Sequence, residues 1–325
     1  MSISQHDAID EDCAQPDSPT VAICVATYMR PKMLGHCLNQ LSNIRLPDSY
    51  RVILIVVDND EKESARAIFE ASPVGRHLEC HYVVEPERGL SQVRNRCLKE
   101  AIARGTEWLA FMDDDEFPDR DWLATLLAAQ ARFQAKIVQA PVIQVPWEDL
   151  AHFDLSQARP KSNHPSGTPV THVNAGNVLF HLAEVKRYDL RFDPYFQFIA
   201  GEDHDFFDRL VEHQGQRAIW CAEALAYEAV VADRLNLSGR LSRSYSGGIA
   251  NVAKFRHRHS RTATALYFLN KSFFKTLTGT VKVLVGLVTS KTRLRTGLRD
   301  VATAVGYLAG LTGRQVQNYR TPDGQ

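Results

Sequence analysis

The run Trp108-Leu109-Ala110-Phe111-Met112-Asp113-Asp114-Asp115-Glu116 decides how the rest of the sequence is interpreted. Apolar and aromatic residues end abruptly at three aspartates, which indicates a buried strand with carboxylates at its C-terminal end. Adjacent carboxylates repel one another, so a folded protein keeps such a cluster on a solvated loop or around a cation. Mg²⁺ and Mn²⁺ prefer oxygen ligands, often one or two carboxylates together with substrate phosphates. Taken alone, the run leaves both a solvated acidic loop and a metal site open.

The segments around this run alternate between strand and helix patterns. Apolar runs at 21–27, 52–57 and 78–84 predict strands, and the intervening stretches at 31–41, 64–71 and 90–104 predict helices. This alternation predicts an α/β fold with an open, mostly parallel sheet flanked by helices. Ligands bind beyond the carboxyl ends of the strands in such sheets. Thr27, Asp58 and Asp113 all lie at predicted strand ends, so we expect them at one edge.

Further segments follow the aspartates. A helix is expected at 121–133, a strand at 136–145 and a loop at 151–171. Two shorter motifs have ordinary structural explanations when taken alone. Gly89 permits a tight turn before a helix that carries Arg94 and Asn95, and such a helix start also suits a phosphate. The acids Glu202, Asp203 and Asp205 suit a helix N-terminus, where the helix dipole favours negative charge.

Composition sets limits on the class of protein. The 325 residues allow one large α/β domain with an extension, and the formal net charge is zero. Charge is unevenly distributed, because 13 Lys/Arg stand against 2 Asp/Glu from Lys254 onward, while 25 basic and 36 acidic residues precede it. The six cysteines show no metal or disulfide spacing. The polar start of the chain has no signal sequence pattern, which favours a cytoplasmic location.

The ordered set of motifs resembles the family-two glycosyltransferases, which are inverting enzymes with the GT-A fold and include bacterial exopolysaccharide sugar transferases. The match extends over roughly residues 21–233. The motifs that carry it are Val25-Ala26-Thr27-Tyr28-Met29-Arg30-Pro31, Val56-Val57-Asp58-Asn59, Arg88-Gly89-Leu90-Ser91 with Arg94-Asn95, Phe111-Met112-Asp113-Asp114-Asp115, and Gly201-Glu202-Asp203. No QxxRW motif of the processive type is present, which favours addition of a single sugar.

The resemblance implies a role for each matching position. Asp113 and Asp115 would form the DxD motif that holds a divalent metal, Mg²⁺ or Mn²⁺, on the donor diphosphate. Asp203 would be the general base. The expected donor-binding residues are Thr27, Arg30, Asp58 (near the uracil of a UDP-sugar), Arg94, Asn95, Asp113 and Asp114. Glu202 and Asn177 would contact the acceptor. Glu228 stands where many relatives have a histidine, which makes it a further candidate metal ligand and puts the usual contact with the diphosphate in doubt.

The C-terminal region combines apolar and basic residues at helical spacing. Apolar residues from Leu266 to Val288 recur at three- and four-residue steps, and Lys271, Lys275 and Lys282 fall on the opposite face. A second segment from Leu294 to Leu308 repeats the scheme. Lys282 argues against a membrane-spanning helix. We expect these helices to lie on a membrane surface, and the alternative is a hairpin packed on the catalytic domain or on a second subunit.

These observations together predict three regions: an N-terminal tail at 1–19, a GT-A catalytic domain at 20–235 and a basic helical region at 236–325. The expected activity is metal-dependent transfer of a hexose from a nucleotide-sugar, UDP-linked by preference, to a hydroxyl of a lipid-linked or growing saccharide at the inner face of the cytoplasmic membrane. A nucleotidyltransferase is an alternative, although Thr27-Tyr28-Met29-Arg30-Pro31 is no glycine-rich, lysine-bearing loop. The other alternative is a non-catalytic saccharide-binding subunit. No nucleic-acid-binding motif is present.

Overall fold

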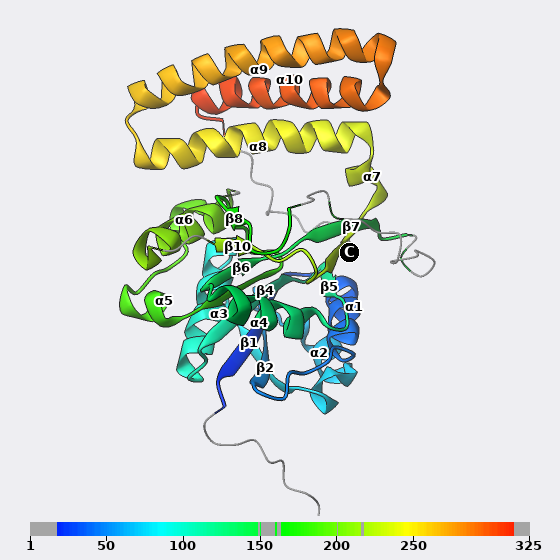
Figure 1. Cartoon of the computed structure of the whole chain (residues 1–325), viewed down its shortest axis with the longest axis vertical. Coiled ribbons are helices and arrows are strands. Elements are labelled where there is room, and N and C mark those ends of the chain that lie inside the picture. Colours follow the sequence, from blue (N-terminus) through cyan, green and yellow to red (C-terminus); the bar gives the residue numbers. More distant parts are fainter. Residues whose placement is uncertain are drawn as a thin grey trace, which may run out of the picture.

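The protein consists of an α/β body and a layer of three long helices that lies across one end of it (Figure 1). The computed structural model describes residues 18–314 apart from 149, 151–159, 161–163, 200 and 216–217. Most of the predicted N-terminal tail and of the predicted 151–171 loop therefore lies outside the described residues. We call the three long helices the helical layer: α8 (Leu237–Arg258), α9 (Arg261–Thr289) and α10 (Lys291–Leu311).

The body is built on an eight-stranded sheet with the strand order β3-β2-β1-β4-β9-β6-β10-β8. Its strands are β1 (Thr20–Thr27), β2 (Arg51–Asp58), β3 (Glu79–Val84), β4 (Trp108–Asp113), β6 (Ile137–Gln139), β8 (Pro169–Val170), β9 (Val178–His181) and β10 (Ala218–Trp220). The strands β3, β2, β1 and β4 run parallel to one another, and β9 is antiparallel to both β4 and β6. The predicted open, mostly parallel α/β sheet is confirmed.

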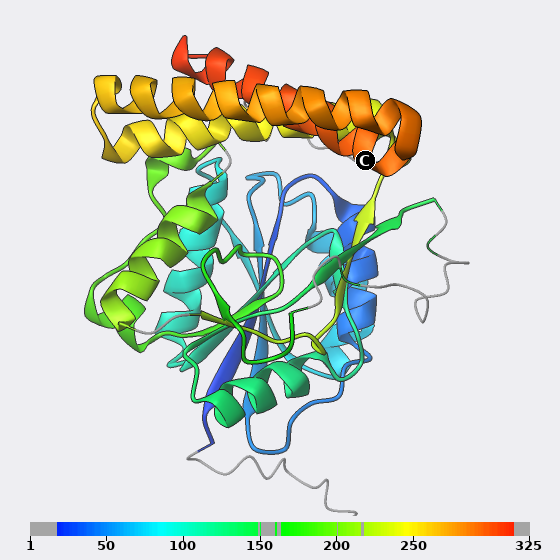
Figure 2. The same ribbon diagram turned by 45° about the horizontal axis from the view of Figure 1, so that its top comes forward.

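The strand register brings the predicted polar residues to one edge of this sheet. Thr27 pairs with Asp58, and Ala26 pairs with Asp113 on the other side of β1. Because parallel strands end together, the polar groups that follow β1, β2 and β4 meet at the same edge. This edge faces the helical layer in Figure 2.

Helices cover both faces of the sheet. Alternate residues of β1 contribute to two separate cores: Val21, Ile23 and Val25 pack with α1 and α4, whereas Ala22 and Cys24 pack with α3 and α6. The helices and short helical turns of the body are α1 (Pro31–Leu41), α2 (Arg66–Ala71), η1 (Pro73–Arg76), α3 (Leu90–Ala103), α4 (Trp122–Phe133), α5 (Ala183–Arg187), η3 (Pro194–Phe196), α6 (Glu202–Gln214) and α7 (Ala232–Leu235). The five described cysteines are free.

A second, three-stranded sheet stands beside the first and corrects one prediction. It contains β5 (Glu116–Pro118), β11 (Ala226–Val230) and β7 (Val142–Pro146), in that order. The strand expected at 136–145 is in fact two strands, β6 and β7, that belong to different sheets. The chain leaves the large sheet at Ala140-Pro141, where proline lacks the N–H that a central strand needs.

Candidate functional site

Three consecutive aspartates at the end of β4 have three different environments. Asp114 is buried and accepts hydrogen bonds from Thr27 Oγ1 at 2.8 Å and from Arg30 Nη1 at 3.0 Å. Arg30 also lies 3.1 Å from Asp115 Oδ2, so one guanidinium bridges two of the carboxylates. Asp113 receives a longer contact of 3.4 Å from Arg94 Nη2. Arg30 directly precedes α1, and Thr27 ends β1, so adjacent elements supply both partners of Asp114.

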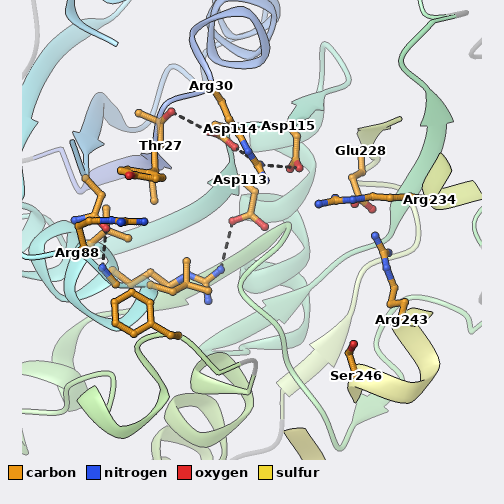
Figure 3. A pocket seen from close by; sticks show the side chains of 18 of the residues that line it. Thr27, Arg30, Arg88, Asp113, Asp114, Asp115, Glu228, Arg234, Arg243 and Ser246 are labelled. Atoms are coloured by element: carbon orange, nitrogen blue, oxygen red, sulfur yellow. Dashed lines mark hydrogen bonds and ion pairs between the residues drawn. The ribbon is translucent and has the colours of Figure 1, made fainter. Parts of the chain in front are cut away.

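A pocket of about 620 Å³ opens between this edge of the sheet and the inner face of α8. Figure 3 shows the aspartates and Arg30 on one wall, and Glu228, Arg234, Arg243 and Ser246 on the other. The predicted residues that line it are Thr27, Arg30, Arg94, Asp113, Asp114, Asp115 and Glu228. The structure therefore brings seven of the twelve predicted site residues together.

Burial disfavours the charged form of several carboxylates at this edge of the sheet. Burial, together with the charges of Asp114 and Asp113, raises the pKa of Asp115 to about 8. Burial also raises the pKa of Asp114 and of Glu116, and Arg30 opposes the effect at Asp114. Burial alone would lower the pKa of Arg30, but Asp114 and Asp115 raise it. The protein thus concentrates more negative charge here than Arg30 offsets, which favours binding of a cation.

A chain of charged contacts joins the aspartates to the start of α6. Arg94, on the buried face of α3, contacts Asp113 on one side and forms an ion pair with the buried Glu202 on the other. Burial, opposed by Arg94, raises the pKa of Glu202 to about 7. Glu202 is shielded from solvent and does not line the pocket, so in this structure it positions Arg94 rather than presenting a free carboxylate to an acceptor.

Asp203 lies in the first turn of α6, next to Glu202. Its carboxylate accepts a hydrogen bond from the backbone N–H of His204 at 2.7 Å, and one from Ala175 N at 3.4 Å. The residue is partly exposed, with 18% of its side chain accessible, and it is not among those that line the pocket. Gly201, with a φ of 117°, starts the helix in a conformation that favours glycine.

Asp58 is fully buried at the end of β2 and is not part of the pocket lining. Its carboxylate accepts hydrogen bonds from Tyr82 Oη at 2.6 Å, Ala65 N at 2.9 Å and Asp60 N at 3.0 Å, and it thereby closes the loop between residues 58 and 65. The next residue, Asn59, lines the pocket instead and accepts a hydrogen bond from Gly89 N at 2.9 Å. Gly89 has a φ of 144°, and a Cβ there would lie 2.8 Å from that of Gln197.

Two predicted amide side chains are occupied by backbone partners. Asn95 donates to Phe192 O at 2.9 Å and accepts from Phe192 N at 2.8 Å, and it thereby holds the segment that leads to α6. Asn177 is fully buried. It donates to the carbonyls of Pro141 and Ala224, each at 2.8 Å, and accepts from Trp122 Nε1 at 2.6 Å. Neither residue lies in the pocket, and both hold the backbone of neighbouring segments in place.

The sequence predicted only one residue, Glu228, of the pocket wall that the second sheet and α8 form. Glu228 accepts a hydrogen bond from Gln144 Nε2 at 2.9 Å, and its charge adds to those that raise the pKa of Asp115. Arg243 and Ser246 come from α8, which lies in the helical region predicted at 236–325. Arg243 and Ser246 lie one turn apart on a helix, and that helical spacing in the sequence was the signal that could have identified them.

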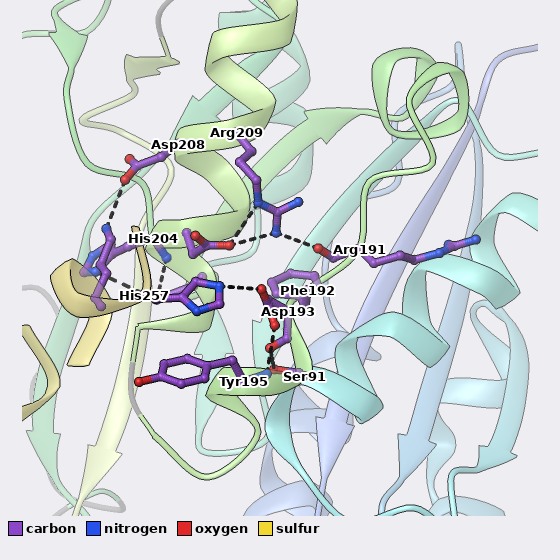
Figure 4. A network of polar contacts seen from close by, with 12 residues as sticks. Ser91, Arg191, Phe192, Asp193, Tyr195, His204, Asp208, Arg209 and His257 are labelled. Atoms are coloured by element: carbon purple, nitrogen blue, oxygen red, sulfur yellow. Dashed lines mark hydrogen bonds and ion pairs between the residues drawn. The ribbon is translucent and has the colours of Figure 1, made fainter. Parts of the chain in front are cut away.

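The far end of α8 is fastened to the body by a polar network (Figure 4). His257 Nε2 lies 2.8 Å from Asp193 Oδ2, Lys254 Nζ lies 3.0 Å from Asp208 Oδ2, and Arg258 Nη2 lies 2.7 Å from Asp205 Oδ1. Asp205 and Asp208 belong to α6, the helix that begins with Glu202 and Asp203. α8 therefore lines the pocket with one part of its length and connects the helical layer to α6 of the body with another.

Among the described residues, no three His, Cys, Asp or Glu side chains converge as a complete metal site. The oxygen donors of Asp113 and Asp115 nevertheless suit Mg²⁺ or Mn²⁺, which are commonly held by one or two carboxylates, waters and substrate phosphates. The residues therefore fit a metal that binds together with its substrate rather than one held by protein alone.

The sequence matches known proteins over most of its length. The family model described as "Glycosyl transferase family 2" matches residues 22–190, about half of the chain. The chain is 30% identical over 236 residues to the "Succinoglycan biosynthesis protein ExoM" of Rhizobium meliloti (strain 1021), which covers 70% of this chain and 72% of that protein.

Solved structures share the fold at low sequence identity. The "Mannosyltransferase PcManGT from Pyrobaculum calidifontis in complex with GDP-Man and Mn2+" superposes with a TM-score of 0.59 at 18% identity, over 90% of this chain and 87% of that chain. The S. aureus TarS fragment 1–349 in complex with UDP-GlcNAc gives a TM-score of 0.51 at 17% identity, over 94% of this chain and 95% of the fragment. The match spans 56% of the longer TarS chain.

Proposed function

Because this chain belongs to glycosyl transferase family 2, we propose that it moves a hexosyl group from a UDP-sugar, with inversion, to a hydroxyl of a lipid-linked or growing saccharide. The observation that carries the proposal is the pocket in which Asp113, Asp114 and Asp115 face a wall that bears Arg234 and Arg243. The relative named for succinoglycan biosynthesis supports a role in the synthesis of a surface polysaccharide. Membership in this family disfavours the nucleotidyltransferase and the non-catalytic subunit.

The donor diphosphate would bind between the two walls. Asp113 and Asp115 are the residues that would hold Mg²⁺ or Mn²⁺. Both carboxylate oxygens of Asp114 already accept hydrogen bonds, from Arg30 and Thr27, whereas Arg30 contacts only one oxygen of Asp115. When bound, the metal would offset the charge of the diphosphate as it leaves. Glu228 is a further candidate ligand from the opposite wall. A relative in fold was solved with GDP-Man and Mn²⁺, and others with UDP or UDP-GlcNAc, which supports a nucleotide-sugar donor.

The arginines offer a substitute for the histidine that many relatives carry at the position of Glu228. Arg243 projects from α8 toward the same region as Arg234, and Arg88 lies on the opposite side over the ring of Tyr28 at 4.4 Å. A guanidinium binds phosphate oxygens with fixed, paired geometry. We assign to Arg243 the role of stabilising the leaving diphosphate, which Glu228 would otherwise repel.

The proposed general base is Asp203. In an inverting displacement the acceptor hydroxyl attacks the face of the sugar opposite the leaving diphosphate, so its proton must be removed across the sugar from the aspartates. Asp203 is partly exposed at the start of α6, and Arg94 and Glu202 connect that helix to Asp113. A positioned carboxylate contributes about 10² to 10⁴ in rate by accepting such a proton.

The C-terminal helices are proposed to hold the enzyme on the inner face of the cytoplasmic membrane. The predicted apolar stripe of α9 is exposed rather than packed on the body, which removes one alternative. α9 is long and apolar enough to cross a membrane, although length and composition are weak evidence by themselves. Its other side packs against α10, and Lys275 and Lys282 pair with Asp300 there, so we propose that α9 lies along the surface.

A donor screen tests the enzymatic proposal. UDP-, GDP- and dTDP-linked hexoses are each incubated with the full chain in the presence of Mn²⁺, Mg²⁺ or EDTA, and thermal unfolding and release of nucleotide are measured. We expect a UDP-sugar to raise the unfolding temperature with Mn²⁺ or Mg²⁺ and not with EDTA. Stabilisation by no nucleotide-sugar under any of these conditions would contradict the proposal, and stabilisation independent of metal would contradict the assignment of Asp113 and Asp115.

A further inference from the structure

The exposed face of α9 points directly away from the rest of the protein. We define the apolar face of α9 as its exposed large hydrophobic residues: Leu266, Leu269, Phe273, Phe274, Leu277, Val281, Leu284, Leu287 and Val288. Leu277 is 52% exposed, Leu284 60% and Val288 87%. The buried residues of the same helix, including Ser272, Gly279 and Gly286, lie on the opposite side and contact α10. A contiguous apolar surface of this kind marks an interaction site.

The three helices of the layer are stacked in a single order from the pocket outward. One face of α8 lines the pocket with Ser242, Arg243 and Ser246. Its other face packs against α10 at Gly248, where a Cβ would lie 2.5 Å from Thr303 O. The opposite side of α10 packs against α9, for example where Ala304 O accepts a hydrogen bond from Ser272 at 3.0 Å. Figure 1 shows α9 on the outside of the stack and α8 next to the body.

The charges of α9 and α10 indicate which kind of partner the apolar face binds. Across α9 and α10, eight basic residues stand against the single acid Asp300: Arg261, Lys271, Lys275, Lys282, Lys291, Arg293, Arg295 and Arg299. Lys291, Arg293 and Arg295 are exposed next to the outermost apolar residue, Val288. Two such faces would bring like charges together, so a second copy of the chain is disfavoured. An apolar strip with exposed basic residues at one end, on two helices of net positive charge, is complementary to a bilayer that contains anionic lipids.

We propose that the helical layer is a spacer that holds the pocket away from the bilayer, so that the acceptor is a lipid-linked saccharide of several sugars. Packed helix axes lie about 8–10 Å apart, so the axis of α8 stands about 16–20 Å from that of α9. If α9 lies in the interface, the pocket on the far side of α8 is about 20 Å from the axis of α9, which places it beyond the lipid headgroups. The first sugar joined to a lipid phosphate lies among those headgroups and does not reach the pocket.

Close packing and ion pairs fix the distance between α9 and the pocket. Glycines at the two contacts (Gly248 with Gly306, and Gly279 with Gly297) bring the helices together backbone to backbone. The ion pairs of Lys254 and Arg258 with α6 hold α8 against the body. This inference rests on the proposed function, because it concerns the acceptor of that reaction. It places the enzyme after other glycosyl transfers, since earlier enzymes must extend the lipid-linked saccharide before this pocket can reach its end.

A depth measurement tests the orientation without activity. In the full chain with Cys13 and Cys80 replaced by serine, single cysteines are introduced by Leu277→Cys or Ser242→Cys and labelled with an environment-sensitive fluorophore. Vesicles of phosphatidylglycerol and phosphatidylcholine with brominated acyl chains serve as quenchers. We expect the label at position 277 to lose more than about half of its emission and the label at position 242 to be unaffected, because brominated acyl chains quench only at the membrane. Equal quenching at both positions would overturn the spacer.

Matched variants test the occupant of the apolar face. Leu277→Glu with Leu284→Glu should abolish co-sedimentation with these vesicles and leave thermal unfolding unchanged, because both side chains are exposed. Tyr188→Glu, at an exposed aromatic residue of the body, should leave binding intact. Vesicle binding unchanged in the double variant would overturn the assignment of this face. A dimer of the full chain that the double variant dissociates would assign the face to a second copy and overturn it as well.

An acceptor series tests the spacing itself. Lipid-linked saccharides are extracted from bacterial membranes, separated by saccharide length, and offered with the labelled donor in vesicles or in detergent. In vesicles, we expect the lipid that carries one sugar to be used at least about tenfold less than longer ones, and detergent should narrow this difference. Equal use of the one-sugar lipid in vesicles would overturn the spacer. Transfer to none of them in either medium would count against the proposed function, while the depth measurement would still decide the spacer.

Discussion

The body and the helical layer arrange polarity in opposite ways. In the body, large apolar side chains such as Ile23, Leu54 and Phe111 are inside, and the charged groups gather at the strand ends. In the helical layer, many close contacts use small and polar residues such as Gly279 and Ser272, beside one small apolar cluster around Val252, Phe268 and Tyr307. Most of the large apolar residues of α9 are outside. Small residues between helices with apolar residues outside are typical of helices in a membrane.

This difference is what the proposed surroundings predict, with water around the body and a membrane surface against α9. The body follows the rule for water, where burial of apolar surface drives folding at about 25 cal/mol per Å². The layer leaves its largest apolar surface unburied, so that surface contributes little to folding in water and becomes favourable when lipid covers it. A change in the pocket should therefore affect transfer alone, and a change in the layer should affect stability and location.

The largest expected effect is at the proposed general base, Asp203, at the start of α6. Asp203→Asn keeps the shape of the side chain and removes its basicity. We expect transfer to fall by about 10² to 10⁴, while binding of UDP and metal, measured by calorimetry, stays nearly normal. Asp208→Asn, on the same helix and paired with Lys254, is the matched control and should keep most of its activity. Near-normal turnover of Asp203→Asn would mean that another group accepts the proton.

The second-largest expected effect is on UDP affinity, at the proposed metal ligand Asp115. Asp115→Asn removes one of the two proposed metal ligands, and we expect UDP affinity in the presence of Mn²⁺ to fall by about 10- to 100-fold, as it should for the unaltered chain in EDTA. The exposed acid Asp119, four residues further along the chain, provides the control Asp119→Asn, which should bind normally. Equal affinity of the unaltered chain for UDP with and without divalent metal would refute the metal assignment.

A third prediction tests the close packing inside the helical layer. Gly306 lies against the backbone of Tyr245 and Gly248, so Gly306→Leu must push α10 away from α8. We expect a loss of about 1–3 kcal/mol in the free energy of unfolding, measured with urea, and a weaker effect on vesicle binding because the apolar face is unchanged. Gly75→Ala, where a Cβ meets nothing within 4 Å, should change stability little. Unaltered stability of Gly306→Leu would argue against tight packing of the layer.

The sequence predicted the pocket edge well because the signals there are local. A buried strand that ends in acids can be recognised from adjacent residues, and parallel strands that end together need no knowledge of distant contacts. Asp58 shows the limit of this logic. It lies at the expected strand end, yet Tyr82, 24 residues away in sequence, donates a hydrogen bond to its carboxylate. Asn59, beside it, lines the pocket instead.

Long-range partners account for the other differences. The ion pair between Arg94 and Glu202 joins residues 108 apart in sequence, and no local pattern specifies it. The sequence pattern did place the apolar and basic residues of α9 on opposite faces. It did not specify which face packs, because that depends on a residue of another helix, Gly297, which lies against Gly279 and Val283 of α9. Lys275 and Lys282 consequently face Asp300 of α10 rather than open solvent.

The smallest expected effect is at Asp300. Replacing it should lower the stability of the protein slightly and strengthen its binding to anionic vesicles slightly. Burial tends to raise the pKa of Asp300, but hydrogen bonds from Lys282 and Lys275 lower it overall. A lowered carboxyl pKa contributes stability that is present above the ordinary value of about 3.9 and is lost as pH falls below it. Asp300→Asn should therefore destabilise the protein at pH 7 by about 1 kcal/mol or less, because the pairs are partly exposed.

Removing this carboxylate also frees two lysines and raises the net positive charge of the layer. We expect Asp300→Asn to bind phosphatidylglycerol vesicles slightly more tightly at pH 7, even though it unfolds more easily, and the difference in stability should vanish below about pH 4. Asp189→Asn, which removes an exposed acid of the body paired with Arg191, is the control for charge alone. Urea unfolding at several pH values and vesicle co-sedimentation measure the two effects. Vesicle binding weakened in parallel with stability would mean that the lysines act only by holding α9 on α10, and that the membrane does not contact them.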